Sequence, residues 1–205
     1  WIMGRLESED LDAKLGGKTI PEICMLRRKM HFGKRFRSEY FILENAFYIM
    51  APGLYVPVTG IENIVKQYTA QDYLIDRRYR YFYLYFDRLE SSADFERLRD
   101  LVENIYTNDY LNKQIVNWNQ SLTAADGKSG LPQQLDFYSR FVRNNKERTV
   151  VIISDALRYE VGRTLFEKIQ ADEKCTATIS AMQAVLPSYT RFGMAALLPH
   201  KTIAV

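Results

Sequence analysis

The sequence predicts an α/β fold: the start of a parallel sheet over residues 149–205, preceded by a mainly α-helical region over residues 1–148. In the first region apolar residues recur at helical spacing, as at Ile61, Ile64, Val65 and Tyr68. From Thr149 onward, strand-like and helix-like segments alternate, and a β-α-β-α-β order is typical of a layered parallel sheet. The chain has 205 residues, of which 47% are hydrophobic, so it can bury a sizeable core.

The totals exclude several classes of protein. A net charge of +3 is too small to indicate nucleic-acid binding by itself. Cys24 and Cys175 show no zinc-binding spacing, and without a signal peptide we expect reduced thiols in a cytoplasmic protein. No apolar run reaches the length of a membrane span. The chain begins at Trp1 without Met and ends in a strand-like stretch, so we expect a piece of a longer protein.

The first region predicts a series of helices. A hydroxyl, a proline and an acid in Thr19-Ile-Pro-Glu22 are typical of a helix start. This helix is expected to continue towards Met50, with Gly33 as a candidate interruption and Pro52-Gly53 as the end. Further helices are expected from residue 61, over 71–89, from 92 through 105, over 108–122 and over 131–145, with a flexible loop at 124–130.

The second region predicts three strands, over residues 149–153, 174–186 and 201–205. The run Thr-Val-Val-Ile-Ile at 149–153 is β-branched without alternation, which favours a strand covered on both faces. Helices are expected over residues 159–170 and from Pro187-Ser188 to about residue 198, placing one helix between each pair of strands.

Asp155 stands where the first predicted strand ends. Ligands bind outside the carboxyl ends of the strands in open α/β sheets, so a carboxylate there can hold a cation. Asp155 could equally cap the next helix, because Asp is a favoured N-cap residue. Arg158, in the first turn of that helix, could contact a substrate phosphate or be a surface charge.

Residues 186–200, LPSYTRFGMAALLPH, place Ser188, Tyr189 and Thr190 at a predicted helix start. Free N–H groups there favour a phosphate, and a metal can activate a hydroxyl as a nucleophile. The alternative is that Ser188 or Thr190 only caps the helix.

Two segments of the helical region raise the question of nucleic-acid binding. Residues 27–37 contain six Lys or Arg with Phe32 and Phe36 interleaved, which suits either DNA or RNA contact or a solvated helix face with two core phenylalanines. Residues 77–88 are dense in tyrosine, which suits base stacking, a core helix or a surface that docks a partner.

SDALRYEV, followed some 35 residues later by LPSYTRFGMAALLPH, resembles the PglZ family of the alkaline phosphatase superfamily. That family belongs to the BREX and phage growth limitation defence systems of bacteria. The resemblance is strong over residues 149–205 and looser over the helical part. It implies that residues 149–205 are the N-terminal part of an alkaline phosphatase-like domain.

The resemblance also implies a role for two residues. Asp155 matches the metal-binding Asp, and Thr190 matches the nucleophile that also contacts the metal. Phosphoryl transfer to Thr190 and hydrolysis by water would follow, with divalent metal ions as cofactors: zinc first, manganese or magnesium as alternatives. Further ligands are expected outside this chain, because neither His31 nor His200 is proposed as one. The chain alone is therefore expected to be inactive.

The resulting hypothesis is a piece of a metal-dependent phosphohydrolase, acting on a phosphoester or phosphodiester in bacterial anti-phage defence. Its expected partners are other proteins of the defence system, with DNA as a further candidate and no membrane. The alternative is a non-catalytic helical adaptor, or a module that binds nucleic acid or protein in a defence complex.

Overall fold

The computed structural model describes residues 1–51 and 53–203, and the chain folds as two compact units. Unit 1 comprises Trp1–Ser121 and unit 2 comprises Leu122–Val205. Residues 122–148, which the sequence pattern groups with the helical region, therefore pack within unit 2. No helix in the described ranges is long and apolar enough to cross a membrane.

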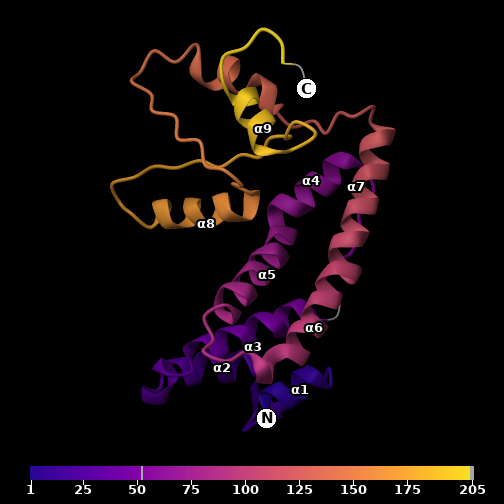
Figure 1. Ribbon diagram of the computed structural model, residues 1–205, viewed down its shortest axis with the longest axis vertical. Coiled ribbons are helices and arrows are strands. Elements are labelled where there is room, and N and C mark those ends of the chain that lie inside the picture. Colours follow the sequence, from indigo (N-terminus) through magenta and orange to yellow (C-terminus); the bar gives the residue numbers. More distant parts are fainter. Residues whose placement is uncertain (52, 204–205) are drawn as a thin grey trace. The chain divides into compact units, whose positions relative to one another are not determined.

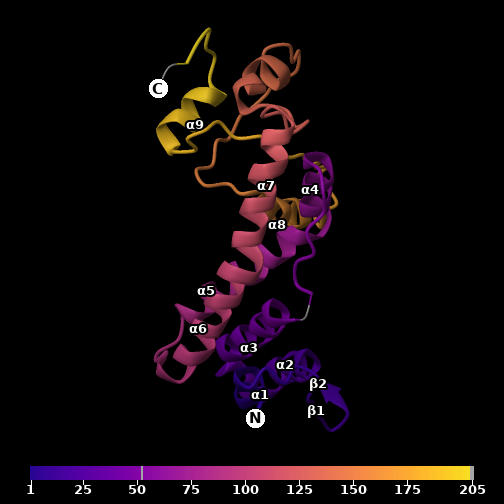
Figure 2. The ribbon, with the colours of Figure 1, turned by 90° about the vertical axis from the view of Figure 1, so that its right-hand side faces the viewer.

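Unit 1 consists of helices and one small antiparallel hairpin (Figures 1 and 2). Two long helical rods, α4 with α5 and α6 with α7, run in opposite directions. Its elements are α1 (Ile2–Glu7), β1 (Lys14–Leu15), β2 (Lys18–Thr19), α2 (Ile20–Lys29), η1 (His31–Lys34), α3 (Arg37–Met50), α4 (Ile61–Gln67), η2 (Tyr68–Asp72), α5 (Tyr73–Phe86), η3 (Ala93–Phe95), α6 (Glu96–Asn104), η4 (Ile105–Leu111) and α7 (Asn112–Ala124), whose last turn enters unit 2.

The predicted helix start at Thr19 is confirmed. The Thr19 N–H and hydroxyl both donate to Glu22 Oε2, each at 2.8 Å. The helix expected to continue towards Met50 is broken at its candidate interruption, Gly33, into α2, the short turn η1 and α3. Gly33 allows this break, since a Cβ there would lie 2.1 Å from the Arg27 carbonyl oxygen. Pro52, expected to end α3 together with Gly53, lies outside the described residues.

Two expected interruptions are absent, because the helices of unit 1 run on through π-helical turns. The segment η2 joins α4 to α5, and η4 joins α6 to α7. A π-helical turn inserts an extra residue and shifts the apolar face of the helix. The sequence pattern predicts separate helices at both places, because a shift of the apolar face interrupts the helical spacing.

The core of unit 1 gathers apolar side chains from α1, α2, α3, α5 and α6. The tyrosine-rich segment 77–88 contributes to it: Tyr79 stacks on Tyr106 with ring centres 3.6 Å apart, and the Tyr79 and Tyr83 hydroxyls both donate to Glu103. This packing agrees with the core-helix interpretation of the segment, because these rings lie inside unit 1 and are part-buried.

Unit 2 contains short helical turns and two longer helices. The predicted helix over residues 159–170 is confirmed as α8 (Tyr159–Gln170). The helix expected from Pro187-Ser188 begins slightly later, as α9 (Thr190–Leu197). The expected helix over 131–145 is replaced by the turns η5 (Gln134–Asp136) and η6 (Tyr138–Val142).

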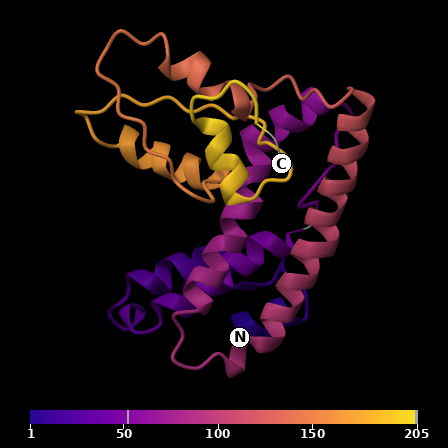
Figure 3. The same ribbon diagram turned by 45° about the horizontal axis from the view of Figure 1, so that its top comes forward.

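The predicted parallel sheet is not formed in the described part of unit 2. The segments expected as strands run as irregular, partly extended chain around α8 and α9, drawn without arrows in Figure 3. A single parallel bridge joins Gln133 to Gln183, and residues 204–205 of the third expected strand lie outside the description. A strand needs a paired neighbour, and the β-branched run at 149–153 has none among the described residues.

Candidate active site

Asp155 stands in a turn between the irregular run 149–153 and α8. The carboxylate accepts a hydrogen bond from the Ala156 N–H at 3.0 Å, and Ala156 itself has a positive φ of 52°. The Arg158 N–H then donates to the Ala156 carbonyl at 2.9 Å and closes the turn. Arg158, not Asp155, occupies the N-cap position of α8, so the alternative role of Asp155 as the cap of this helix is not adopted.

Thr190 is the first residue of α9, after Tyr189 at the N-cap position and a cis peptide bond between Leu186 and Pro187. Its hydroxyl lies 3.1 Å from Asp155 Oδ1 and 3.2 Å from Oδ2, so it donates to both carboxylate oxygens. The structure thus brings together two residues that are 35 positions apart in the sequence. Both side chains are exposed, so a ligand can reach them.

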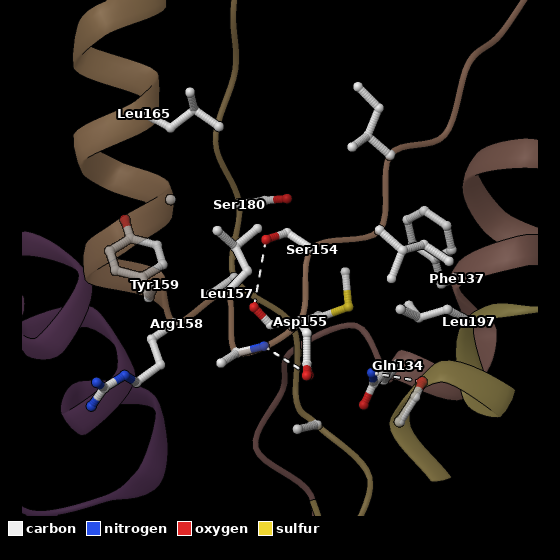
Figure 4. A pocket seen from close by; sticks show the side chains of 18 of the residues that line it. Gln134, Phe137, Ser154, Asp155, Leu157, Arg158, Tyr159, Leu165, Ser180 and Leu197 are labelled. Atoms are coloured by element: carbon white, nitrogen blue, oxygen red, sulfur yellow. Dashed lines mark hydrogen bonds between the residues drawn. The ribbon is translucent and has the colours of Figure 1, made fainter. Parts of the chain in front are cut away.

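Asp155 and Thr190 line a cavity of about 760 Å³ within unit 2. Its walls come from residues 151–154, the start of α8, the segment 177–184 and α9. Figure 4 shows Asp155 among the lining side chains, with Ser154 and Leu157 beside it and Ser180 further along the wall. Apolar residues form most of the cavity lining, so the carboxylate is a polar group in an open apolar cleft.

Gln134 contributes to the cavity, and sequence reasoning missed it. Its Oε1 accepts from the Val185 N–H at 3.0 Å. Its Nε2 donates to the Gly193 carbonyl at 3.1 Å, the dashed line at Gln134 in Figure 4. One amide therefore holds both the chain that leads to Thr190 and the helix that Thr190 begins. A glutamine inside a predicted helix carries no signal of this role, because the contact spans more than 50 residues.

The other candidate residues lie outside the contact between Asp155 and Thr190. Arg158 lines the cavity and is exposed, and its side chain points away from Asp155 in Figure 4. His200 Nδ1 lies 2.8 Å from the Leu198 carbonyl oxygen and is not among the cavity residues. His31 belongs to η1 in unit 1. Within the described residues, no group of three or more His, Cys, Asp or Glu side chains is placed to hold a metal ion.

The site lies in a part of the chain that matches a known family. Residues 137–205 match the model of the BREX system PglZ alkaline phosphatase-like domain. Residues 137–205 thus belong to the PglZ family. Asp155, Thr190 and α8 all fall within the matched PglZ segment, whereas Gln134 lies just before it.

Two curated relatives extend the similarity into unit 1. The alkaline phosphatase-like protein PglZ of Bacillus cereus (strain H3081.97) is 42% identical over 193 residues, which cover 89% of this chain and 23% of that protein. The alkaline phosphatase-like protein BrxZ of Escherichia coli O9:H4 (strain HS) is 36% identical over 150 residues, covering 67% of this chain and 17% of that protein. The chain therefore spans a quarter or less of each relative. No solved structure gives a significant match.

Proposed function

We propose that this chain supplies Asp155 and Thr190 to the active site of a metal-dependent phosphohydrolase that cleaves phosphoesters or phosphodiesters. The observation that carries the proposal is the contact of the Thr190 hydroxyl with both oxygens of the Asp155 carboxylate, at 3.1 and 3.2 Å, in an open cavity. A hydroxyl at a helix N-terminus beside a carboxylate is a suitable nucleophile for phosphorus, because backbone N–H groups there favour a bound anion.

In this mechanism Thr190 Oγ1 forms a bond to phosphorus while the bond to the leaving-group oxygen breaks. The Asp155 carboxylate orients the hydroxyl and accepts its proton, as the hydrogen bond in the structure already prepares it to do. The proton taken up by Asp155 passes to the leaving alkoxide. A water molecule then attacks phosphorus, the bond to Thr190 Oγ1 breaks, and one proton of the water restores the Thr190 hydroxyl. The product is phosphate from a monoester substrate and a phosphomonoester from a diester substrate. Substrate enters through the open side of the cavity.

The donor set fits part of a divalent-cation site. A carboxylate and a hydroxyl are oxygen donors of the kind that hard cations prefer. Asp155 and Thr190 would hold the cation, which when bound supplies positive charge that favours ionisation of the hydroxyl and offsets charge on the phosphoryl oxygens. Because these two side chains are fewer than a closed coordination shell requires, the remaining ligands are proposed to come from residues other than those described.

The test is hydrolysis of bis-para-nitrophenyl phosphate by the purified full-length protein with added zinc, manganese or magnesium. We expect Thr190→Ala and Asp155→Ala each to lower the rate by about a hundredfold or more. Ser188→Ala is the matched control, because it removes an exposed hydroxyl from the same cavity two residues earlier and should leave the rate unchanged. Equal rates in wild type and in all three variants would exclude the proposed site.

We also propose that the protein acts in BREX anti-phage defence, with other proteins of that system as partners. The support is the description of the matching family and the similarity to PglZ and BrxZ. Phage plating on cells that carry wild type or Asp155→Ala tests this role. Loss of defence with the variant supports catalysis in defence. Full defence with the variant, but none after gene deletion, supports the non-catalytic adaptor instead.

A further inference from the structure

Residues 27–37, termed the basic segment, lie in unit 1, away from the candidate active site in sequence. They cover the end of α2, the turn η1 and the start of α3. The segment holds six Lys or Arg, and no acidic residue occurs from Ile23 to Ser38. One cation, Arg28, is neutralised by an ion pair with Glu44. The other arginines and lysines of the basic segment keep a local positive charge, which the small net charge of the whole chain does not show.

The apolar side chains of the basic segment face solvent. Sequence reasoning left open whether Phe32 and Phe36 belong to the core, and the structure places them outside it, with exposed fractions of 39% and 42%. Met30, two residues before Phe32, is 46% exposed. Arg27 lies 5.5 Å from the centre of the Phe32 ring, and Arg35 lies 5.5 Å from the centre of the Phe36 ring. Each exposed ring therefore has a guanidinium beside it.

The backbone of the basic segment has a defined shape. The Gly33 N–H donates to the Met30 carbonyl at 2.9 Å, and the Arg35 N–H donates to the Phe32 carbonyl at 3.1 Å. Gly33 is buried against the end of α2, where no other residue fits. The two phenylalanines are thus presented by a folded turn, so a ligand meets a preformed surface.

We infer that the basic segment binds single-stranded nucleic acid. Phosphates bind to Lys29, Lys34 and the arginines other than Arg28, and unpaired bases stack on Phe32 and Phe36. Basic side chains alone would suit any polyanion, but exposed rings interleaved with them match the stacking platforms of single-strand binders. A duplex offers no free base faces to such rings. A membrane-surface helix would separate its apolar and charged faces, whereas here they alternate within one short turn.

The experiment measures fluorescence anisotropy of labelled oligothymidylate about 12 nucleotides long, in EDTA, from about 50 to 200 mM salt. EDTA removes divalent cations, so the result does not depend on the proposed hydrolysis. The triple variant Lys29→Gln, Lys34→Gln, Arg35→Gln should bind more weakly, and its salt-dependence slope should fall by about 2, because each phosphate contact to a single strand contributes about 0.7. Phe32→Ala with Phe36→Ala should lower affinity about tenfold or more at an unchanged slope.

The matched control is the triple variant Lys14→Gln, Lys66→Gln, Arg97→Gln, which removes the same charge from exposed positions elsewhere in unit 1. It should bind like wild type. The inference is overturned if wild type does not bind, if both triple variants lose affinity equally, or if duplex DNA, a polyglutamate peptide or anionic vesicles bind as tightly as the single strand. Thermal unfolding of each variant verifies that the fold is kept.

Discussion

The two thiols of the chain lie in contrasting surroundings. Cys24 is fully buried in the core of unit 1, and burial, with Glu44 nearby, raises its pKa to about 12. Cys175 is exposed, and neither thiol is in a disulfide. The thiolate is the reactive form of cysteine, so burial and the raised pKa together make Cys24 inert in the folded protein.

Alkylation by iodoacetamide near neutral pH is therefore expected to modify Cys175 and leave Cys24 untouched. Mass spectrometry of the digested protein measures both sites. Modification of both cysteines after unfolding in urea is the control. Rapid labelling of Cys24 in the native protein would contradict its placement in the core.

A second prediction at the residue scale concerns Asp72, which is only 5% exposed. Burial raises the pKa of Asp72, although a hydrogen bond from Gln67 Nε2 at 2.9 Å opposes the shift. The folded protein therefore binds the proton of the Asp72 carboxyl group more tightly than the unfolded chain does. Stability is therefore lost as pH rises from the pKa of the unfolded state through that of the folded state.

Asp72→Asn has no such proton to lose. We expect the free energy of unfolding of the variant, relative to wild type, to shift in favour of the variant as pH rises from about 4 to 7. Urea unfolding monitored by circular dichroism at several pH values measures this difference. If the difference in free energy of unfolding between variant and wild type stays constant over this pH range, the pKa of Asp72 is not raised in the folded protein.

At the scale of elements, Gly33 decides how α2 joins α3. A Cβ at this position would lie 2.1 Å from the Arg27 carbonyl oxygen, a backbone atom that cannot rotate away. Gly33→Ala is expected to lower the free energy of unfolding by about 1–3 kcal/mol, as overpacking does elsewhere. Gly4→Ala is the matched control: Gly4 lies in α1 with open space around it, and alanine favours helix by about 0.5–1 kcal/mol. Equal stabilities of both variants would refute this account.

Sequence patterns predicted the elements that depend on local signals. The capping box at Thr19 and the amphipathic span of α8 are confirmed, because both are encoded within a few residues. The π-helical joins at η2 and η4 were not foreseen, because a shifted apolar face looks the same as a chain break. The strand prediction at 149–153 failed because β-branched residues set only a preference, and pairing requires a neighbouring strand.

The candidate site shows the same division between local and long-range information. Asp155 and Thr190 were singled out from their motifs, and the structure places them in contact, while their catalytic roles stay predictions. Gln134 could not be found from sequence, because its two hydrogen bonds join segments that are remote in the chain. The resemblance to the PglZ family pointed to Asp155 and Thr190. Gln134, which holds α9, was identified only from the structure.

At the scale of the whole molecule, the two units differ in how much apolar surface they bury. Unit 1 has a continuous core, whereas the buried apolar side chains in the described part of unit 2 are Val185 and Ala196. Protection from hydrogen exchange follows such packing. We expect amides of α8 and α9 to exchange markedly faster than those of α3 and α5, measured by mass spectrometry after digestion. Equal protection in both units would contradict this difference.

The uncovered run at residues 149–153 has a practical consequence. Val150 and Ile152 are 76% and 87% exposed, and no strand pairing involves them among the residues that the structure describes. Short β-branched stretches of this kind readily stack against copies of themselves, which leads to aggregation. Concentrated preparations of this 205-residue chain are therefore expected to precipitate through residues 149–153, and Ile152→Lys should lower the turbidity of such preparations.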